Sequence, residues 1–438
     1  MNKVVGIVAE YNPFHNGHLY QINKIREKYK DATIVVVCSS SFTQRGDTSI
    51  LNKFDKAKVA LNNGVNLVVE LPYVYSTQSS DIFASAAIKI LNYLKVDTIC
   101  FGTERDSIGD IKKCAITQLD EPKYNEIVRE ELELGVNYPT ALNKALKKLI
   151  DIEITEPNDL LALSYVKEII KNQYNIEIFN IKRTNDFHDI DSNEMIVSAS
   201  NIRNKLINNI DIKDKVPSDV YKILKNIKFN DKYFEFLKYK INSENDLEKY
   251  LDVDEGLSTR IRNSIGKSNS LDELILNIKT KRYTYNKISR MLNHILCSFT
   301  KDERDQTKDI EYIRVLGFDE VGQKHLNSIK DNMDIKILNK FDTSYKALEI
   351  EKRVSSIYSM IISDIMDKEI KNIPVKKWLL KVTFILLHTS LYHSLFLLLV
   401  VRLIYIYFPL YLLRFLLLLL FLLLVHQILI HHELVITF

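Results

Sequence analysis

Two histidines three residues apart, His15 and His18, stand where the chain could perform phosphate chemistry. Residues 4–9 before them form an apolar run that is typical of a buried parallel strand, and an Asn-Pro turn signal follows. A helix that starts after such a loop offers unpaired N–H groups to an anion. Gly17 lets a ligand approach the backbone closely. Two imidazoles there can hold phosphate oxygens while charge moves onto a leaving pyrophosphate.

The alternative interpretation is a capped first helix in which the two histidines only pack. Leu19, Ile22 and Ile25 fall at helical spacing after the loop, so a helix is predicted under either interpretation. A histidine pair around a glycine, directly after a strand, favours the nucleotide site.

The elements that position this loop alternate between strand and helix. Strands are predicted at 4–9, 34–38, 67–71 and 98–101, with helices at 19–29, 51–62 and 81–94. This alternation predicts an α/β fold with a doubly wound parallel sheet. Ligands of such sheets bind beyond the carboxyl ends of the strands. The segments that follow the strands, which begin at His15, Ser39, Pro72 and Gly102, are therefore expected to gather along one edge.

Two further junctions complete the predicted sheet domain. Asn158 or Asp159 is predicted to cap a helix, and a strand at 176–181 leads to Arg183. Ser198 and Ser200 then open another helix that carries Arg203 in its first turns. Ordinary capping by serine explains this last segment when it is considered alone. Together with the histidine pair, a second phosphate contact is favoured.

Four segments together resemble a known family. Residues 10–18 (EYNPFHNGH) contain the H-x-G-H signature of nucleotidylyltransferases and class I tRNA synthetases. With residues 41–46 (SFTQRG), 69–75 (VELPYVY) and 101–104 (FGTE), the chain resembles the bacterial tRNA(Met) cytidine acetate ligase family. The resemblance runs from about residue 3 to about residue 370 and includes 280–284 (TKRYT) and 314–318 (RVLGF).

This resemblance implies a nucleotidylyltransferase-type sheet and a two-step reaction. Acetate attacks the α-phosphorus of ATP, giving acetyl-adenylate and pyrophosphate. The acetyl group then passes to the exocyclic amine of the wobble cytidine of elongator tRNA(Met), giving N4-acetylcytidine. ATP would be a substrate accompanied by Mg²⁺, and no tightly bound cofactor is implied. No carboxylate cluster in the sequence marks a metal site. Because acetate is itself the nucleophile, the protein mainly positions ATP and stabilises charge.

The resemblance also implies roles for individual residues. His15 and His18 would be catalytic, and Gln44 and Arg45 would reach acetate or the target base. Phosphate contacts are expected at Ser198, Ser200 and Arg203. ATP contacts are expected at Ile7, Val8, Ala9, Glu10, Tyr11, Asn12, Pro13, Phe14, His15, Asn16, Gly17, His18, Leu19, Tyr20, Gly102, Asn158 and Arg183. One departure is the run Ser39-Ser40-Ser41, where the family usually has a Gly and an Asn beside the Phe, so a bulkier Ser at the Gly position is expected to alter the shape of this loop.

The sequence divides into three predicted regions. Residues 1–210 form a Rossmann-like nucleotide-binding domain, and residues 211–375 form a mainly helical domain, because Gly and Pro become scarce there. In the helical domain Lys281, Arg282 and Tyr283 combine cations with an aromatic ring, which suits contacts to tRNA. A solvated helical face with aromatic core residues is nearly as well supported.

Residues 376–438 form an anomalous apolar tail. It is rich in Leu, Phe, Tyr and His, and from residue 382 onward only Arg402, Arg414 and Glu433 are charged. A membrane anchor is one interpretation, since residues 415–425 are wholly apolar, although Pro409 and Arg414 interrupt the longer stretch that a membrane span would need. A frameshift near residue 374 in an A/T-rich gene is the preferred hypothesis. Peptides of the tail found by mass spectrometry of the native protein would contradict the frameshift hypothesis.

Composition narrows the class of protein further. The 438 residues carry 60 Lys or Arg against 56 Asp or Glu, a net charge of +4, which alone does not establish an RNA partner. None of the four cysteines forms a C-x-x-C pair, so neither a zinc site nor a disulfide framework is predicted. A strand begins almost at the N-terminus, so no signal peptide is expected, and a reducing cytoplasm fits. A membrane partner is expected only if the tail is genuine.

Three functions therefore compete. The first is the acetate-activating tRNA ligase, with tRNA, acetate and ATP as partners. The second is an adenylyltransferase that acts on a small phosphorylated acceptor, against which the long region after residue 211 counts. The third is a non-enzymatic RNA-binding or membrane-associated protein, against which the histidine pair counts.

Overall fold

A computed structural model describes residues 2–120, 122–183, 194–227, 232–254, 256–338, 341–371 and 373–377. Residues 1–377 form one compact unit. The apolar tail predicted at 376–438, with its anchor and frameshift hypotheses, lies outside the described residues from 378 onward. Within the described ranges, no helix combines the length and the apolar character that crossing a membrane requires.

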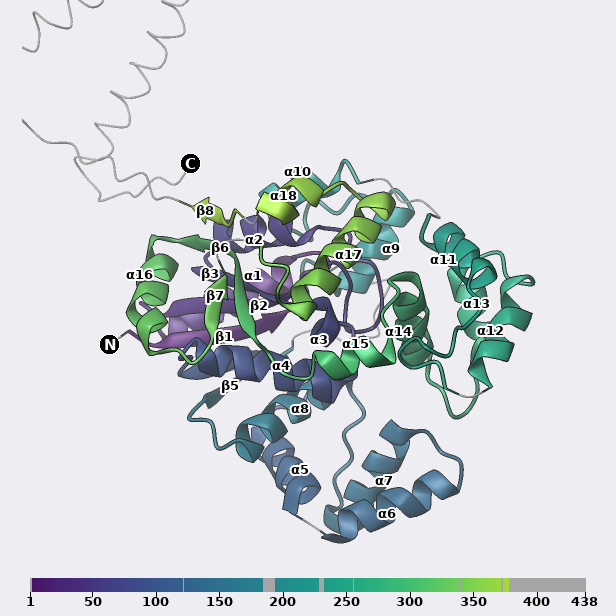
Figure 1. Ribbon diagram of the computed structural model, residues 1–438. Coiled ribbons are helices and arrows are strands. Elements are labelled where there is room, and N and C mark those ends of the chain that lie inside the picture. The colour runs from purple at the N-terminus through teal and green to yellow at the C-terminus, as the bar shows by residue number, and fades with distance from the viewer. Residues whose placement is uncertain are drawn as a thin grey trace, which may run out of the picture. The chain divides into compact units, whose positions relative to one another are not determined.

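A mixed sheet organises the unit, and five of its strands alternate with helices as predicted (Figure 1). The strands are β1 (Val4–Ala9), β2 (Thr33–Ser39), β3 (Leu67–Leu71), β4 (Thr98–Thr103), β5 (Glu177–Lys182), β6 (Tyr312–Asp319), β7 (Lys336–Leu338) and β8 (Val375–Lys377). Their order is β5-β4-β1-β2-β3-β6-β7, and β8 pairs with β6. Strands β5 to β3 in this order are all parallel. The predicted doubly wound parallel sheet is confirmed, and the loop after β1 lies at its topological switch point.

Alternation along the strands explains why helices cover both faces. In β2, Val35 and Val37 point into one hydrophobic core, whereas Ile34, Val36 and Cys38 point into the other. Helices α4 (Ser80–Tyr93) and α8 (Pro157–Lys171) pack on the first core. Helices α1 (Asn16–Lys28), α2 (Lys53–Asn62), α9 (Ala199–Ile207) and α10 (Ser218–Leu224) pack on the second.

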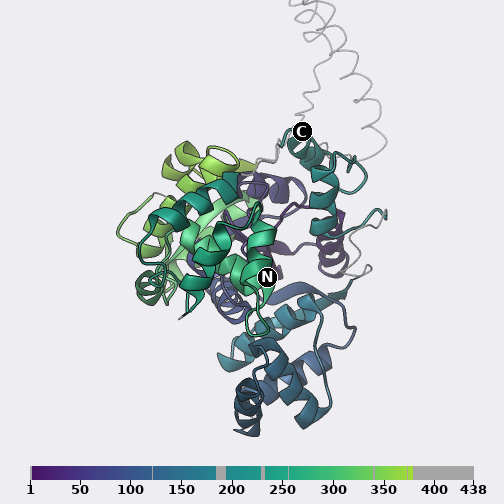
Figure 2. The same ribbon diagram turned by 90° about the vertical axis from the view of Figure 1, so that its right-hand side faces the viewer.

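Two groups of helices extend from the sheet. One comprises α5 (Ile108–Asp120), α6 (Pro122–Glu133) and α7 (Tyr138–Ile150), which lie below the sheet with α8 in both views (Figures 1 and 2). The other comprises α11 (Lys232–Ser243), α12 (Leu257–Ile265), α13 (Leu271–Ile278) and α14 (Tyr285–Leu296). The remaining helices are α3 (Tyr73–Ser76), α15 (Lys301–Gln306), α16 (Glu320–Ile329), the 3-10 helix η1 (Lys330–Asn332), α17 (Lys346–Ile361) and α18 (Met366–Lys371).

The second half of the chain is mainly helical, but it also returns to the sheet. Strand β6 pairs antiparallel with β3, and β7 and β8 pair parallel with β6. The sequence analysis did not foresee these three strands. The division at residue 210 stays a prediction.

Five buried charged side chains connect distant parts of this fold. Lys53 Nζ lies 2.7 Å from Glu70 Oε1, 3.0 Å from Glu351 Oε1 and 2.9 Å from Glu369. Arg314 Nη1 lies 2.7 Å from Glu369 Oε1. All five side chains are fully buried, so α2, β3, β6, α17 and α18 share one ionic cluster.

Candidate nucleotide-binding site

The histidine pair forms a reciprocal cap at the start of α1. His15 is the N-cap residue, and its Nδ1 accepts a hydrogen bond from Gly17 N at 3.0 Å. His18 Nδ1 accepts in turn from His15 N at 3.1 Å. Serine or threonine followed by glutamate usually makes this capping box, so the two imidazoles replace the common side chains. The ring centroids lie 3.9 Å apart.

The cap determines which ring nitrogens remain for a ligand. Both Nδ1 atoms accept backbone N–H bonds, so each neutral ring carries its proton on Nε2. Burial, with the charges of Arg183 and Arg203, lowers the pKa of His15 to about 3. Burial also lowers the pKa of His18, and His15 and Arg183 contribute. The pair therefore offers two neutral Nε2–H donors from one helical turn, which suits phosphate oxygens.

Gly17 is required by the position of the His15 ring. A Cβ atom added at residue 17 would lie 2.8 Å from His15 Cε1 and 2.9 Å from His15 Nδ1. Any larger residue would displace the imidazole or break its cap. The glycine predicted to admit a ligand therefore also leaves room for the histidine.

Two arginines converge on the pair from different elements. Arg203 on α9 donates from Nη1 to Asn12 O at 2.8 Å and from Nη2 to Ser200 Oγ at 3.2 Å. Arg183 directly follows β5, and its Nε lies 3.8 Å from Glu104 Oε1. Both arginine charges contribute to the lowered pKa of His15. The site thus combines two neutral donors with two cations.

The serine hydroxyl groups at the start of α9 both make hydrogen bonds within the protein. Ser198 is the N-cap residue and its Oγ accepts from Asn201 N at 3.2 Å, as ordinary capping predicts. Ser200 Oγ accepts from Arg203. The serines therefore shape the helix start and position the arginine.

Glu104 is a residue that the sequence analysis quoted in a motif but did not place in the site. Its carboxylate accepts from Asn158 Nδ2 and, at 3.2 Å, from Asp159 N. It thereby joins the end of β4 to the start of α8. Burial raises the pKa of Glu104. An acidic residue directly after a strand, at the edge where ligands bind, was the available signal.

The predicted cap of α8 at Asn158 or Asp159 is wrong. Helix α8 begins at Pro157, and Glu156 is its N-cap residue. Proline favours the first helical position because its fixed φ suits the helix and it has no N–H to leave unpaired. Gly102, predicted to follow its strand, lies inside β4, and a Cβ added there would be 3.5 Å from Arg183 Cγ.

Other residues between 7 and 20 support the histidine pair by packing against it and by hydrogen bonding to neighbouring segments. Ile7, Tyr11 and Phe14 are buried core side chains, and Tyr11 and Phe14 pack against the His18 ring. Asn16 Nδ2 donates to Met195 O and Asp214 O, which ties the helix start to the segments around α9. The remaining members of the expected contact set are Val8, Ala9, Glu10, Asn12, Pro13, Gly17, Leu19 and Tyr20.

Gln44 and Arg45 lie on a loop that meets the end of β1. Gln44 N donates to Glu10 Oε1 at 2.6 Å, and Gln44 Nε2 donates to Gln78 O at 2.7 Å. Burial raises the pKa of Glu10, while Lys56 and Arg45 oppose this rise. This loop therefore borders the carboxyl edge of the sheet beside the first strand.

The serine run that departs from the family pattern is fully buried. The Lys56 ammonium donates to Ser39 O at 3.1 Å and to Ser40 O at 3.0 Å. Ser41 O accepts from Ser49 N at 3.0 Å. A buried lysine therefore fixes the backbone of this run.

The residues predicted to contact tRNA lie on the connection between α13 and α14. Lys281 and Arg282 are exposed, and Arg282 lies 5.7 Å from the ring centroid of Tyr283.

Among the described residues, no group of three or more His, Cys, Asp or Glu side chains is placed to hold a metal ion. All four cysteines are buried and free.

Known proteins of one family match most of this chain. A family model described as HIGH Nucleotidyl Transferase matches residues 2–372. The chain is 34% identical over 403 residues to the tRNA(Met) cytidine acetate ligase of Anoxybacillus flavithermus, covering 85% of this chain and 100% of the relative. It is 38% identical over 381 residues to the ligase of the same name from Caldicellulosiruptor saccharolyticus, covering 82% and 94%.

Two solved structures are also similar. The apo crystal structure of Thermotoga maritima TmcAL matches with a TM-score of 0.78 at 26% identity. The structure of that protein bound with alpha-thio ATP matches with a TM-score of 0.75 at 27% identity. Each match covers 86% of this chain and 100% of the other.

Proposed function

The chain belongs to the HIGH nucleotidyl transferase family and, within it, to the tRNA(Met) cytidine acetate ligases, and we propose that it performs their reaction. It uses ATP to activate acetate and transfers the acetyl group to the wobble cytidine of elongator tRNA(Met). The relatives are matched along nearly their whole length, which supports a ligase rather than a short adenylyltransferase.

In the first step an acetate oxygen bonds to the α-phosphorus of ATP while the bond from this phosphorus to the bridging oxygen of pyrophosphate breaks. Negative charge grows on the departing pyrophosphate. The Nε2–H groups of His15 and His18 donate to its oxygens, and Arg183 and Arg203 supply positive charge nearby. The pair of neutral donors is the observation that carries this proposal, because it needs no protonation change during the step.

In the second step the cytidine amine attacks the acetyl carbonyl carbon, AMP leaves, and the amine gives up a proton. Gln44 and Arg45 contact acetate or the base, since their loop borders the end of β1. Lys281, Arg282 and Tyr283 contact the tRNA, Mg²⁺ arrives with ATP, and the reaction takes place in the cytoplasm. The other expected ATP contacts among residues 7–20, with Gly102, Asn158 and Arg183, hold the nucleotide.

One assay separates the competing functions. Pyrophosphate release from ATP is measured with and without acetate, and acetyl transfer to tRNA(Met) is measured afterwards. The proposal predicts release that depends on acetate, followed by transfer to the wobble cytidine. Turnover that ignores acetate but needs a phosphorylated alcohol would instead support the small-acceptor adenylyltransferase. tRNA binding without any turnover would support a non-enzymatic protein.

A further inference from the structure

The strongest unassigned feature is a concentration of positive charge in helices α12 to α14. Residues 256–290 hold eight Lys or Arg and two Asp or Glu, a balance of +6 in a chain whose net charge is +4. The rest of the protein is therefore slightly acidic. A local excess of this size marks a surface for a polyanion.

Most of these cations are not neutralised by carboxylates. Among the described residues, only Lys287 of the eight forms a salt bridge, with Asp254 at 3.1 Å. Arg260 and Arg262 donate instead to backbone carbonyls. Lys267, like Lys281, is exposed and has no carboxylate within salt-bridge distance in the described part of the chain. Their charge remains available to a ligand.

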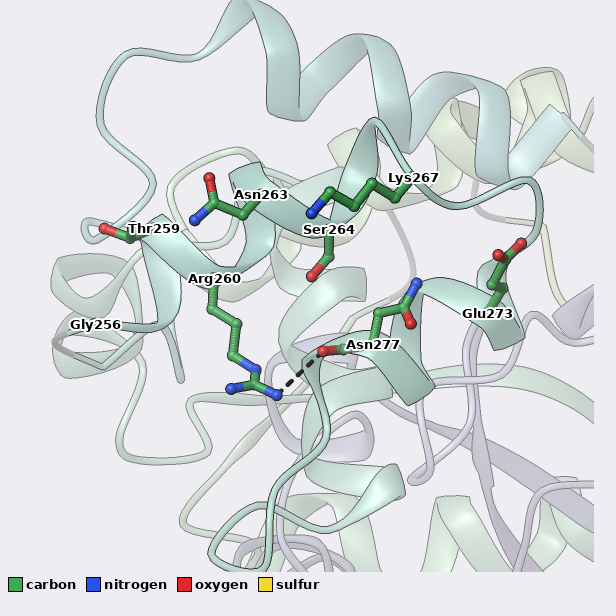
Figure 3. Close-up of a pocket in the computed structure, with 8 residues that line it drawn as sticks. All are labelled: Gly256, Thr259, Arg260, Asn263, Ser264, Lys267, Glu273 and Asn277. Atoms are coloured by element: carbon green, nitrogen blue, oxygen red, sulfur yellow. Dashed lines mark hydrogen bonds between the residues drawn. The ribbon is translucent and has the colours of Figure 1, made fainter.

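A groove of about 660 Å³ lies along the neighbouring helices α12 and α13 in this region (Figure 3). Arg260 crosses it to the carbonyl of Asn277 at 3.2 Å, and Lys267 extends beside Asn263. The one carboxylate in the lining, Glu273, already accepts from Asn269 N at 2.8 Å. The groove also begins at Gly256, which provides no side-chain cap for the N–H groups of α12.

Helix α14 connects this region to the edge of the sheet. Its N-terminus follows Tyr283, and farther along Asn293 Nδ2 donates to Gly46 O at 3.3 Å. A Cβ added at Gly46 would lie 2.8 Å from Arg290 N, so the loop presses directly on the helix backbone. The helical region that carries the groove is thus in contact, through α14, with the loop that carries Gln44.

We propose that the α12–α13 groove binds a phosphate of the tRNA backbone away from the reacting cytidine, with Lys267 as its principal cation. The proposal rests on the proposed function for the identity of the RNA. Amide and hydroxyl donors beside unpaired cations are what phosphodiester oxygens require, and the neighbouring Tyr283 ring, with Lys287 5.0 Å from its centroid, suits an adjoining base.

The test compares Lys267→Glu with Lys147→Glu, a matched change on α7 at an exposed lysine paired with Asp151. Acetate-dependent ATP–pyrophosphate exchange without tRNA should stay within about twofold of wild type in both variants, which also shows that both fold. For Lys267→Glu, the KM for tRNA in acetyl transfer should rise about 5- to 10-fold with kcat nearly unchanged. The slope of log affinity for tRNA against log salt should fall by about one. Asn263→Asp should raise the KM in the same direction.

The proposal is overturned if Lys267→Glu leaves the KM and the salt slope unchanged, or if Lys147→Glu changes them equally. Binding of the wild type to anionic phospholipid vesicles that is lost in Lys267→Glu, with tRNA affinity intact, would also overturn it. If the wild type shows no acetate-dependent exchange, the proposed function fails. Direct tRNA binding by the wild type and the Lys267→Glu variant then still decides whether the groove holds RNA.

Discussion

At the scale of single residues, the histidine pair has two separable duties. The Nδ1 atoms complete a helix cap, which leaves the Nε2–H groups for the phosphate contacts that we propose. Asparagine at position 15 and glutamine at position 18 could each accept the same backbone N–H bond, because both are favoured in caps. Neither would reproduce an imidazole Nε2–H donor. These two substitutions therefore separate the contribution of the histidines to stability, through the helix cap, from their contribution to phosphate binding.

The first prediction concerns His15→Asn and pH. Burial, with Arg183 and Arg203, lowers the pKa of His15 to about 3 in the fold, whereas an unfolded histidine has a pKa of about 6.5. Below pH 6.5 only the unfolded state takes up this proton, so the stability of the wild type falls as pH falls. Between pH 7.5 and pH 5 the free energy of unfolding should decrease by about 2 kcal/mol more in the wild type than in His15→Asn. Urea unfolding of both proteins, without ATP, measures this, and equal decreases would contradict the burial of His15 in its neutral form.

At the scale of elements, the loop that carries Gln44 depends on one glycine. Gly46 has a φ of +92°, and an added Cβ would lie 2.8 Å from both Arg290 N and Ser289 C. Gly135 between α6 and α7 also has a positive φ, +83°, but an added Cβ would meet nothing within 4 Å. Substitutions at these two glycines therefore separate the energetic cost of a left-handed backbone from the cost of a close contact.

The second prediction follows from this comparison. Gly135→Ala should lower the free energy of unfolding by about 1 kcal/mol, the cost of a left-handed backbone for alanine. Gly46→Ala should lower it by about 1–3 kcal/mol more, because α14 and the loop must separate. Chemical denaturation measures both. Equal losses in the two variants would show that the loop does not press on α14.

Particular elements show what the sequence could and could not predict. Strands β1 to β5 follow from apolar runs, and the strand–loop–helix around His15 follows from its turn and glycine. Strand β6 was missed because it contains Arg314, whose partner Glu369 lies 55 residues away in the chain. The capping role of the histidines was missed for a similar reason, since it depends on contacts that only the folded chain supplies. Glu104 was missed although its place directly after a strand was a usable signal.

At the scale of the whole molecule, the buried ionic cluster joins the first half of the chain to α17 and α18. It holds three carboxylates and two cations, so one negative charge is in excess. Burial and the charge of Glu351 raise the pKa of Glu70 to about 7. Burial opposes ionisation of Glu369 too, but Lys53 and Arg314 outweigh it and hold its pKa at about 2. Of these two carboxyls, Glu70 is therefore the one that takes up a proton more readily.

The third prediction contrasts the same substitution at these two positions. At pH 7 Glu70→Gln should change the free energy of unfolding by no more than about 1 kcal/mol, because it replaces a group that is already about half protonated with a neutral one. Glu369→Gln should cost about 3–5 kcal/mol, because two buried cations lose their shared carboxylate. Denaturant titration of both variants gives the comparison. Similar costs at both positions would mean that the proton is placed on the wrong carboxylate.

The measurement that tests the central claim most directly is acetate-dependent ATP–pyrophosphate exchange by His18→Gln. Glutamine preserves the cap of α1 and removes only the ring donor, so the melting temperature should stay close to that of wild type. The exchange rate should fall about 10²-fold, the scale of one lost transition-state donor. A folded variant that exchanges pyrophosphate at the wild-type rate would contradict the assignment of the histidine pair to phosphate binding.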